Sequence, residues 1–430
     1  MRMSDFRQIL KQTVYLPTLP CNFKSLVGLL RFVGLLPAKR KSSGENCRIL
    51  IAQPYDSLGD LVLSFPLLDE VHRQWPEAEI DLIVGRAMTS LFRGVPYIHR
   101  VLGFTPTPSR PLSRHRDVLR LLSFCRREMR DGYDLALDPR WDSDGYAYLA
   151  RAMVFLSGAS VRVGYSGCVD GVDLTLDEFL THLAQGGRNE HESIRKLRLL
   201  QRTGLCTRVV EESAVLQVNA TLCAVAELGK TSLGSLLHKA GIQPGERYVA
   251  LAPSATTPMR VWPIEYLAKL IQTLHARYGL RFVVVGTSSD VVLCNGVVAM
   301  CPEIAVSLAG KTNIGELLAL LANAALFIGN DSGPAHLSGI LGRDTVTISP
   351  FPVSSNRLDH FNAPRRFRPC GPRVRVIQPN QPLPPCDPVC SWDEAHCITQ
   401  VSAEAVLGAY ENLLLTNSSK RCQLETAQIL

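Results

Sequence analysis

Residues able to do chemistry occur where short apolar runs give way to polar loops, and the first such place is Ser57-Leu58-Gly59-Asp60. These residues follow the apolar run at 48–53 and precede a predicted helix. Asp60, at the start of that helix, suits two roles. It can be a helix N-cap, or a general base at the carboxyl edge of a parallel sheet, where ligands bind in such folds. Taken alone, the pattern favours the N-cap.

The loop at residues 253–262 also joins a predicted strand to a predicted helix. It offers two hydroxyls, Thr256 and Thr257, and one cation, Arg260. Hydroxyls, a guanidinium and a helix N-terminus together suit a phosphate or diphosphate. An ordinary polar loop fits the same residues, so this loop alone leaves both interpretations open.

A third loop, at residues 329–336, has the sequence Gly-Asn-Asp-Ser-Gly-Pro-Ala-His. Gly333 allows the backbone to approach a ligand closely, and Pro334 suits the first position of a helix. The hydroxyl of Ser332 and the exposed amides from Ser332 to Ala335 can donate to phosphate oxygens. We therefore expect this loop to be the strongest phosphate site in the chain.

Two titratable residues flank these phosphate donors. His336 can donate to a phosphate, but a half-buried structural histidine fits it equally well. Asp331 would repel a phosphate, so we expect it to cap the turn or to accept a hydroxyl of a sugar or ribose. The third loop thus combines donors for an anion with an acceptor for hydroxyls.

Alternating strands and helices must position these loops. Apolar runs predict strands in two series, at residues 48–53, 79–84, 101–104, 133–137 and 161–165, and then at 248–252, 281–285, 325–328 and 345–348. Helical periodicity lies between them, at 61–74 (with Pro66 as a kink), 117–129, 192–201, 263–276, 314–322, 335–341 and 402–415. Strand–helix–strand series predict parallel sheets covered on both faces, here two doubly wound, Rossmann-like α/β domains.

The predicted domains are continuous in sequence. They are a basic amphipathic extension at 1–47, a first Rossmann-like domain at 48–235, a second at 236–416 and a loose tail at 417–430. Residues 356–388 are rich in proline and arginine and are predicted to be surface loop.

The net charge of +7 is concentrated in the extension. Residues 1–48 hold nine of the 46 basic and two of the 39 acidic residues, so the remainder has 37 of each. Residues 22–37 combine Lys24 and Arg31 with an apolar remainder, which fits a helix lying in a membrane interface or one packed on the protein. We expect no cleavable signal peptide and no membrane-spanning segment. No basic stripe with interleaved aromatics is present, so nucleic-acid binding has little support.

Thirteen scattered cysteines indicate a reducing compartment. Cys386, Cys390 and Cys397, with His396 beside them, can bind zinc, but their spacing departs from CxxC and free thiols are favoured. Neither GxGxxG after a first strand nor GxxxxGK[ST] occurs, which argues against a dehydrogenase and a P-loop enzyme.

Several motifs, taken in order, resemble glycosyltransferase family 9, whose best-known members are the lipopolysaccharide heptosyltransferases. The motifs are Ser57-Leu58-Gly59-Asp60 followed by Pro66-Leu67-Leu68, then Arg260-Val261-Trp262-Pro263, Leu308-Ala309-Gly310-Lys311-Thr312 and Asn330 to Leu337. The resemblance covers roughly residues 48–410, and the three late cysteines resemble a pattern found in part of the family.

The resemblance implies a GT-B fold, in which two Rossmann-like domains face a cleft. It implies an inverting, metal-independent sugar transfer from a nucleotide-diphosphate sugar, with no further cofactor. For a heptosyltransferase the donor is ADP-heptose, and the acceptor is the lipopolysaccharide core or a related lipid-linked saccharide. Such an enzyme would be cytoplasmic, and its basic residues 1–45 would hold it on the anionic cytoplasmic face of the inner membrane.

The resemblance also implies roles for residues. Asp60 would be the catalytic base, with Ser57, Leu58 and Gly59 on the acceptor side. Arg260, where family members commonly carry lysine, would contact the donor diphosphate. Thr256 and Thr257 resemble the phosphate-binding hydroxyls, and Asp290 is the nearest match to an acidic residue that meets the nucleoside. The alternatives are another sugar donor, a nucleotide-sugar 2-epimerase, or a non-catalytic membrane-associated binding protein.

Overall fold

The computed structural model describes residues 27, 36, 47–105, 115–140, 145–166, 168–169, 172–173, 177–186, 190–356, 364–387, 390 and 392–427. These residues form two compact units, each built from three stretches of the chain. The first holds the described residues of Met1–Asp56, Leu67–Gly187 and Arg195–Val210, and the second those of Ser57–Pro66, Arg188–Ile194 and Glu211–Leu430.

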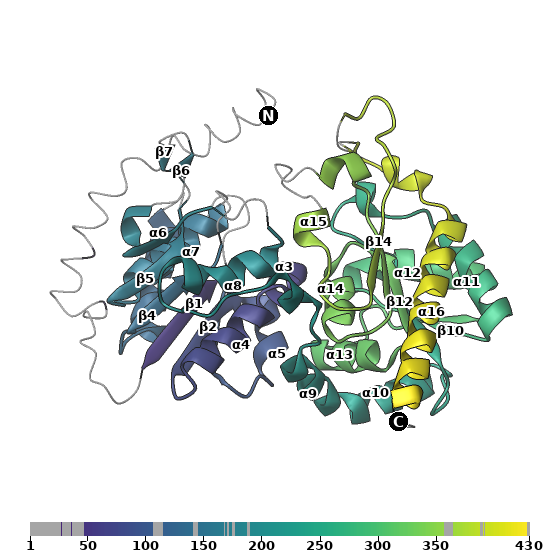
Figure 1. The fold of residues 1–430 in the computed structure, drawn as a ribbon, viewed down its shortest axis with the longest axis horizontal. Coiled ribbons are helices and arrows are strands. Elements are labelled where there is room, and N and C mark those ends of the chain that lie inside the picture. The colour runs from purple at the N-terminus through teal and green to yellow at the C-terminus, as the bar shows by residue number, and fades with distance from the viewer. Residues whose placement is uncertain are drawn as a thin grey trace. The chain divides into compact units, whose positions relative to one another are not determined.

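The first unit is built on a six-stranded parallel sheet with the order β3-β2-β1-β4-β5-β8 (Figure 1). Its strands are β1 (Arg48–Gln53), β2 (Glu79–Gly85), β3 (Ile98–Phe104), β4 (Leu135–Asp138), β5 (Val161–Tyr165) and β8 (His182–Ala184). Its helical segments include α4 (Phe65–Gln74), α5 (Thr89–Phe92), α6 (His115–Glu128), α7 (Gly145–Leu156) and α8 (Glu192–Arg202). All six residues of β1 are buried, as an apolar run at the centre of a parallel sheet requires.

The second unit repeats this plan with the order β11-β10-β9-β12-β13-β14. Its strands are β9 (Tyr248–Ala252), β10 (Arg281–Val284), β11 (Ala305–Ser307), β12 (Leu326–Asn330), β13 (Thr345–Ile348) and β14 (Val374–Ile377). Its helices are α3 (Leu58–Val62), α9 (Ala220–Leu228), α10 (Lys230–Lys239), α11 (Ile264–Tyr278), α12 (Val291–Met300), α13 (Ile314–Asn323), α14 (Gly333–Ile340), α15 (Pro364–Phe367) and α16 (Ala403–Ala427). The strand order reverses between β9 and β12, so their carboxyl ends border the crevice where such sheets bind ligands.

The single helix predicted at 61–74 is two helices, α3 and α4. The chain turns at Leu63 and Ser64, and Pro66 is the second residue of α4 rather than a kink. Proline lacks an amide hydrogen, and the first turn of a helix is where that donor is not needed. The break matters because α3 belongs to the second unit, whereas α4 continues into the first.

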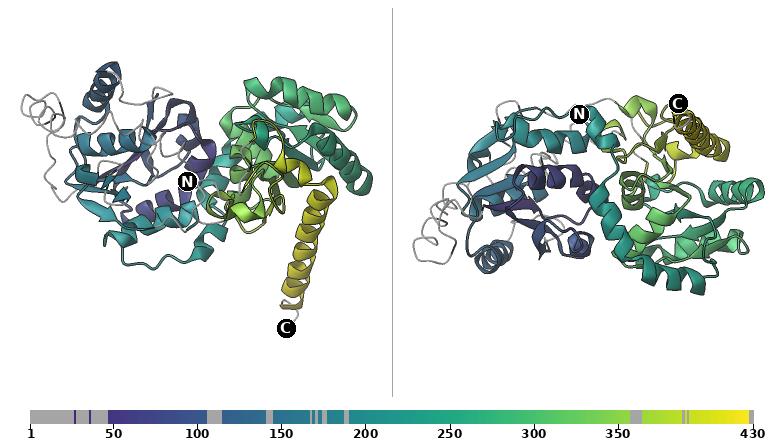
Figure 2. Two further views of the ribbon diagram at one scale, coloured as in Figure 1. Left: turned by 90° about the horizontal axis from the view of Figure 1, so that it is seen from above. Right: turned by 60° about the horizontal axis from the view of Figure 1, so that its bottom comes forward.

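Other predictions are also corrected. Residues 356–388 contain α15 and the edge strand β14, because β14 pairs with β13 over four residues from Thr345 to Ile348. The predicted loose tail is helical as far as Ala427, as the yellow helix α16 in Figure 2 shows. Both α9 and α10 belong to the second unit, so the change of unit falls at Val210 and not at residue 235.

Little of the extension 1–47 lies within the described residues. Val27 and Leu36 do, and both are buried in the core cluster of the first unit together with Leu50 and Met153. At these two positions the apolar residues pack on the protein. Among the described helices, none combines the length and the apolar character that crossing a bilayer requires.

Candidate active site

The two loops that were expected to bind phosphate lie together at the carboxyl ends of β9 and β12. Asn330, which is buried at the end of β12, joins them: its Nδ2 donates to Pro253 O over 2.6 Å, and its Oδ1 accepts from Trp262 N over 3.1 Å. The Trp262 indole is buried and donates to Val401 O over 2.8 Å. The hydrogen bonds of Asn330 therefore hold the two loops together where the strand order reverses, and their binding of phosphate stays a prediction.

Arg260 ends the short 3₁₀ turn Pro258–Arg260, and its amide donates to Thr257 O over 3.0 Å. Its guanidinium carbon lies 5.2 Å from the centre of the Phe351 ring. A guanidinium that lies over an aromatic face can still donate its N–H groups to an anion. Thr256 and Thr257 are exposed on the same turn, so the two hydroxyls and the cation share one loop.

Ser332 is the N-cap residue of α14, and its hydroxyl oxygen is buried with no hydrogen-bond partner among the described residues. Pro334 is the second helical residue, one position later than predicted, and it has no amide hydrogen. The amide of Ala335 donates to Ser332 O over 3.1 Å. Fewer donors than predicted are therefore available at the start of α14: the hydroxyl and amide of Ser332 at the N-cap and the amide of Gly333, the first helical residue.

Asp60 belongs to the second unit, because α3 packs on α14. A Cβ atom on Gly59 would lie 3.0 Å from Cδ2 of His336, and one on Gly333 would lie 2.6 Å from Cδ2 of Leu58. Both glycines are thus required by the close approach of the two helices. Asp60 is the third residue of α3, and Ser57 holds the N-cap position, so the N-cap interpretation of Asp60 was wrong.

The charges of this region act on one another. Burial raises the pKa of Asp331, the nearby Asp60 raises it further, and His336 and Arg260 oppose that rise. His336 is buried, and its Nε2 lies 3.8 Å from Oδ1 of Asp331. Two carboxylates, an imidazole and a guanidinium therefore form one electrostatic cluster, the Asp331 cluster (Asp60, Arg260, Asp331 and His336), within the second unit.

His191 is a neighbour of this cluster that the sequence did not reveal. Its Nε2 donates to Arg368 O over 2.9 Å, and its Nδ1 accepts from Ser193 N over 3.3 Å. Burial lowers the pKa of His191 to about 4; the hydrogen bond to Arg368 O opposes this lowering, and the charges of Arg368 and His336 add to it. The imidazole is therefore neutral and structurally engaged at neutral pH. No local motif marks it, since Arg368, the acceptor of its Nε2 hydrogen bond, lies far away in sequence.

Asp290 has a structural role in a turn. It lies in the turn Ser288–Asp290 after β10, and its Oδ2 accepts from Thr287 N over 2.7 Å and from Thr287 Oγ1 over 2.6 Å. These bonds form a capping box at the start of the turn. The carboxylate accepts two hydrogen bonds within this turn, and its contact with a nucleoside stays a prediction.

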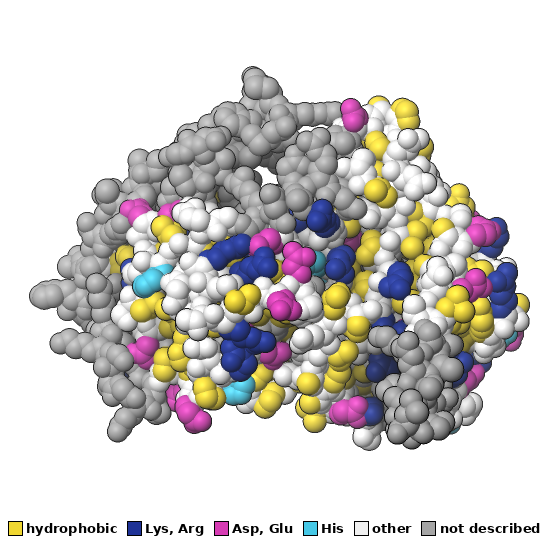
Figure 3. Space-filling model, in the orientation of Figure 1, with side chains coloured by type: hydrophobic (Ala, Val, Ile, Leu, Met, Phe, Trp, Pro, Cys, Tyr) yellow, Lys and Arg dark blue, Asp and Glu magenta, His cyan; other side chains and the backbone are white. Residues whose placement is uncertain are grey.

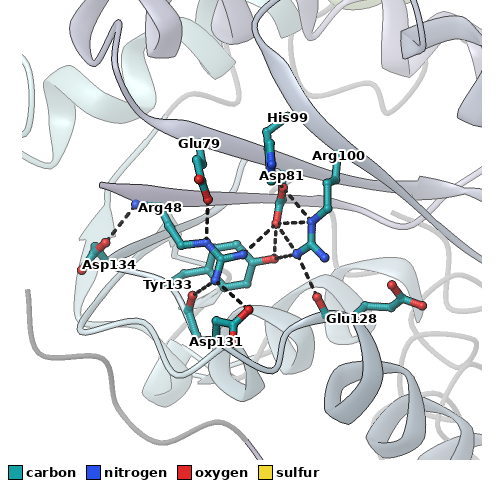
Figure 4. Close-up of polar contacts among 10 residues, drawn as sticks. Arg48, Glu79, Asp81, His99, Arg100, Glu128, Asp131, Tyr133 and Asp134 are labelled. Atoms are coloured by element: carbon teal, nitrogen blue, oxygen red, sulfur yellow. Dashed lines mark hydrogen bonds and ion pairs between the residues drawn. The ribbon is translucent and has the colours of Figure 1, made fainter. Parts of the chain in front are cut away.

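The first unit holds a buried charge cluster at the opposite, amino end of its strands (Figure 4). In this Asp81 cluster, the carboxylate of Asp81 accepts from Arg100 Nη2 over 2.6 Å, from Tyr133 Oη over 2.6 Å and from His99 Nδ1 over 3.1 Å. Arg48 Nη2 adds a contact at 3.5 Å. Burial would raise the pKa of Asp81, but hydrogen bonds from Arg100, Tyr133 and His99 outweigh it, and the pKa is lowered.

A cavity of about 360 Å³ lies at the carboxyl end of β3 in the first unit. Its lining combines three arginines with apolar side chains, namely Arg86, Arg120, Arg127, Phe104, Leu119 and Phe124. Elsewhere on the face drawn in Figure 3, basic and acidic side chains are interspersed over the described surface. Guanidinium groups beside an apolar wall suit an anionic saccharide.

Comparison with known proteins gives a consistent result. Residues 149–356 match the family model of glycosyltransferase family 9 (heptosyltransferase). The chain is 25% identical over 292 residues to lipopolysaccharide heptosyltransferase 3 of Escherichia coli (strain K12), which covers 67% of this chain and 79% of the relative.

Solved structures agree in fold. The glycosyl transferase family 9 protein from Veillonella parvula DSM 2008 matches with a TM-score of 0.65 at 18% identity, covering 86% of this chain and 98% of that one. Escherichia coli heptosyltransferase WaaC with ADP-2-deoxy-2-fluoro heptose matches with a TM-score of 0.61 at 17% identity, covering 85% and 99%. The two Rossmann-like sheets are those of the GT-B fold, as predicted.

Proposed function

The chain belongs to glycosyltransferase family 9 and is a glycosyltransferase, and from this premise we propose that it moves a heptose from ADP-heptose onto the lipopolysaccharide core or a related lipid-linked saccharide. The observation that carries the proposal is the crevice between β9 and β12. The two loops at these strand ends carry a buried Ser332 hydroxyl that has no partner among the described residues, two exposed threonines and Arg260. The solved relative with an ADP-heptose analogue supports this choice of donor.

In the proposed reaction, Asp60 takes the proton of the acceptor hydroxyl, whose oxygen attacks the anomeric carbon from the face opposite the diphosphate. The bond from that carbon to the diphosphate oxygen breaks, ADP leaves, and the configuration inverts. Arg260, Thr256, Thr257, the Ser332 hydroxyl and the Gly333 amide stabilise the charge that develops on the leaving group. These groups do the work that a metal ion does in other transferases, so we propose that the reaction needs none.

The side chains of the Asp331 cluster are compatible with the proposed roles in acid–base catalysis and donor binding. Burial raises the pKa of Asp331, and its carboxyl can hydrogen-bond a sugar hydroxyl. His336, 3.8 Å from Asp331, can donate to a phosphate oxygen. Asp60 lies on α3 in the second unit, so the proposed base is fixed to the same body as the donor loops.

Acid–base catalysis by Asp60 is tested by Asp60→Asn. The amide keeps the shape but cannot accept the proton, so we expect the rate of transfer to fall at least 100-fold, while the affinity for the nucleotide sugar changes little. Transfer is read by mass, with a panel of nucleotide sugars and truncated lipopolysaccharide acceptors. Glu265→Gln is the matched control, since Glu265 is an exposed acid in the first turn of α11.

If Asp60→Asn retains more than a few per cent of the rate, Asp60 is not the base. Incubation without acceptor separates the alternatives, because a 2-epimerase would change the nucleotide sugar under these conditions and a transferase would not. Efficient transfer from a different nucleotide sugar in the panel would replace heptose while leaving the reaction type in place.

We further propose that the basic residues of the extension hold the enzyme on an anionic cytoplasmic membrane face, where a lipid-linked acceptor resides. Val27 and Leu36 are buried in the first unit's core, so the proposed attachment is electrostatic. Replacing Lys39, Arg40 and Lys41 by glutamine is expected to weaken binding to anionic liposomes about tenfold or more and to spare turnover of a soluble acceptor. Replacement of Lys230, Lys239 and Lys269, which are exposed on the second unit, is the control; equal binding by both triple variants would refute the proposal.

A further inference from the structure

Three cysteines and one histidine converge after β14, far from the Asp331 cluster in sequence. The ligand atoms of Cys386, Cys390, His396 and Cys397 all lie within 4.8 Å of one another. Nδ1 of His396 is 3.5 Å from the sulfur of Cys386 and 3.5 Å from the sulfur of Cys397. The three cysteines are buried and reduced. The free-thiol interpretation favoured by the sequence spacing does not account for this convergence.

The distances match a four-coordinate metal. A tetrahedral centre with metal–sulfur bonds of about 2.3 Å and metal–nitrogen bonds of about 2.0 Å holds a sulfur and a nitrogen ligand about 3.5 Å apart. Two sulfur–nitrogen pairs in the cluster have this separation. All the ligand atoms lie within 4.8 Å of one another, which leaves room for the separation of about 3.8 Å that the same centre sets between two sulfurs.

The surroundings are those of an enclosed structural site. The amide of Leu383 donates to the sulfur of Cys397 over 3.4 Å, which suits a thiolate. The Trp392 ring stacks on His396 with the ring centres 5.1 Å apart and fixes the imidazole plane. Met259 and Leu383 pack against the three sulfurs.

We propose that Cys386, Cys390, His396 and Cys397 bind one Zn²⁺ ion as a structural Cys₃His site, distinct from the residues that carry the transfer. Three thiolates and an imidazole in a closed tetrahedron are a ligand set that favours zinc over magnesium or calcium. Four protein ligands leave no open position for substrate, so the ion serves the fold and is compatible with a reaction that uses no metal.

The site also supports the donor loop. Met259, which packs on the sulfurs, is the residue before Arg260, and the indole of Trp262 donates to Val401 O just after the last ligand's turn, Cys397–Gln400. Zinc would thus fix the segment on which the Arg260 turn rests. Loss of the ion is expected to raise the KM for the nucleotide sugar more than it lowers kcat.

The test is elemental analysis of the full chain purified without chelator. We expect about one zinc per chain, falling below a tenth in Cys390→Ser, with Cys301→Ser as the control because Cys301 is a buried cysteine elsewhere in the same unit. Cobalt substitution provides a readout in the unmodified chain: a tetrahedral thiolate site gives intense visible and near-ultraviolet bands.

Zinc below a tenth of an equivalent, no cobalt bands and three freely titrating thiols in the native chain would overturn the proposal, and so would stoichiometric iron in place of zinc. Metal content and cobalt spectra do not depend on turnover. These measurements can therefore refute the zinc site without affecting the proposed transfer reaction, and the transfer assays can refute that reaction without affecting the zinc site.

Discussion

The Asp81 cluster of the first unit and the Asp331 cluster of the second are built from the same kinds of side chain, yet they treat their carboxylates in opposite ways. Asp81 is fully buried, and its hydrogen-bonded cations and Tyr133 lower its pKa. Asp331 is 15% exposed at its side chain, and its pKa is raised. Asp81 is therefore the better compensated carboxylate, because cations and Tyr133 hydrogen-bond to it directly.

The difference between the two pKa shifts follows from where each cluster lies on its sheet. The Asp81 cluster lies at the amino ends of β1 and β2, where a doubly wound sheet binds no ligand, and its groups can satisfy one another. The Asp331 cluster lies at the carboxyl ends of β9 and β12 and leaves the Ser332 hydroxyl without a partner. A polar cluster that satisfies itself supports the fold, and one that does not is prepared for a ligand.

The largest effect on stability is expected for Asp81→Asn, which breaks a buried ion pair and leaves Arg100 and Arg48 without the carboxylate that neutralises them. The free energy of unfolding should fall by about 3–5 kcal/mol, measured by chemical denaturation, with unchanged kcat per folded molecule. Asp131→Asn is the control, because the exposed Asp131 lies 3.7 Å from the same Arg48 and should change stability by less than about 0.5 kcal/mol.

The Asp81 cluster also predicts that the free energy of unfolding decreases at low pH. Since the folded pKa of Asp81 is below its ordinary value, the stabilisation is complete above the unfolded pKa of about 4 and is lost as the pH falls through the lower folded value. Loss of transfer chemistry with full stability in Asp81→Asn would break the comparison, because it would make Asp81 a functional residue.

His191 sharpens the comparison, because it is a satisfied group beside an unsatisfied cluster. Its folded pKa of about 4 lies below the unfolded value of about 6.5, so its contribution is complete above pH 6.5 and is lost as the pH falls toward 4. The loss should amount to about 3 kcal/mol in the unfolding free energy. In His191→Gln that part of the pH dependence should disappear; a pH profile identical to that of the parent chain would show that His191 does not titrate in this way.

The smallest effect is expected for Ser332→Ala. Removing a buried hydroxyl that lacks a partner should leave stability unchanged or slightly higher, while the affinity for the nucleotide sugar falls about three- to tenfold, measured by calorimetry. Ser338→Ala is the control: Ser338 is buried in the same helix, but its hydroxyl lies 2.8 Å from Thr345 Oγ1. A stability loss in Ser332→Ala with unchanged affinity would make this serine structural and erase the contrast between the clusters.

Much of the fold could be predicted from the sequence, because buried parallel strands are continuous apolar runs. Residues 161–165, 248–252 and 345–348 were predicted with the observed strand limits. The edge strand β14 was missed, since its residues are only partly buried and alternate valine with arginine before isoleucine. The end of α16 was missed for a similar reason, because its last turns carry no apolar period.

The site was predicted in part. Strand-end loops can be recognised locally, so Arg260, Ser332 and His336 could be proposed from the sequence, and their roles stay predictions. Long-range packing cannot be recognised locally. In the sequence Asp60 comes just after β1 of the first sheet, but Leu58 and Gly59 contact α14, and Asp60 therefore belongs to the second unit. The four ligands of the proposed zinc site likewise lie within twelve residues whose spacing resembles no common motif, and only the folded loop brings them together.

The alternation of stretches between the units has a consequence for exchanging parts among relatives. The chain passes from one unit to the other five times, at residues 56–57, 66–67, 187–188, 194–195 and 210–211. A chimera joined once, at residue 210, would take α3 from one parent and α14 from the other. Leu58 would then meet a foreign Gly333, and Gly59 a foreign His336. To exchange the first unit by recombination, residues 57–66 and 188–194 must travel with the C-terminal part, so that each hybrid takes the proposed base, Asp60, and the proposed donor loops from the same parent.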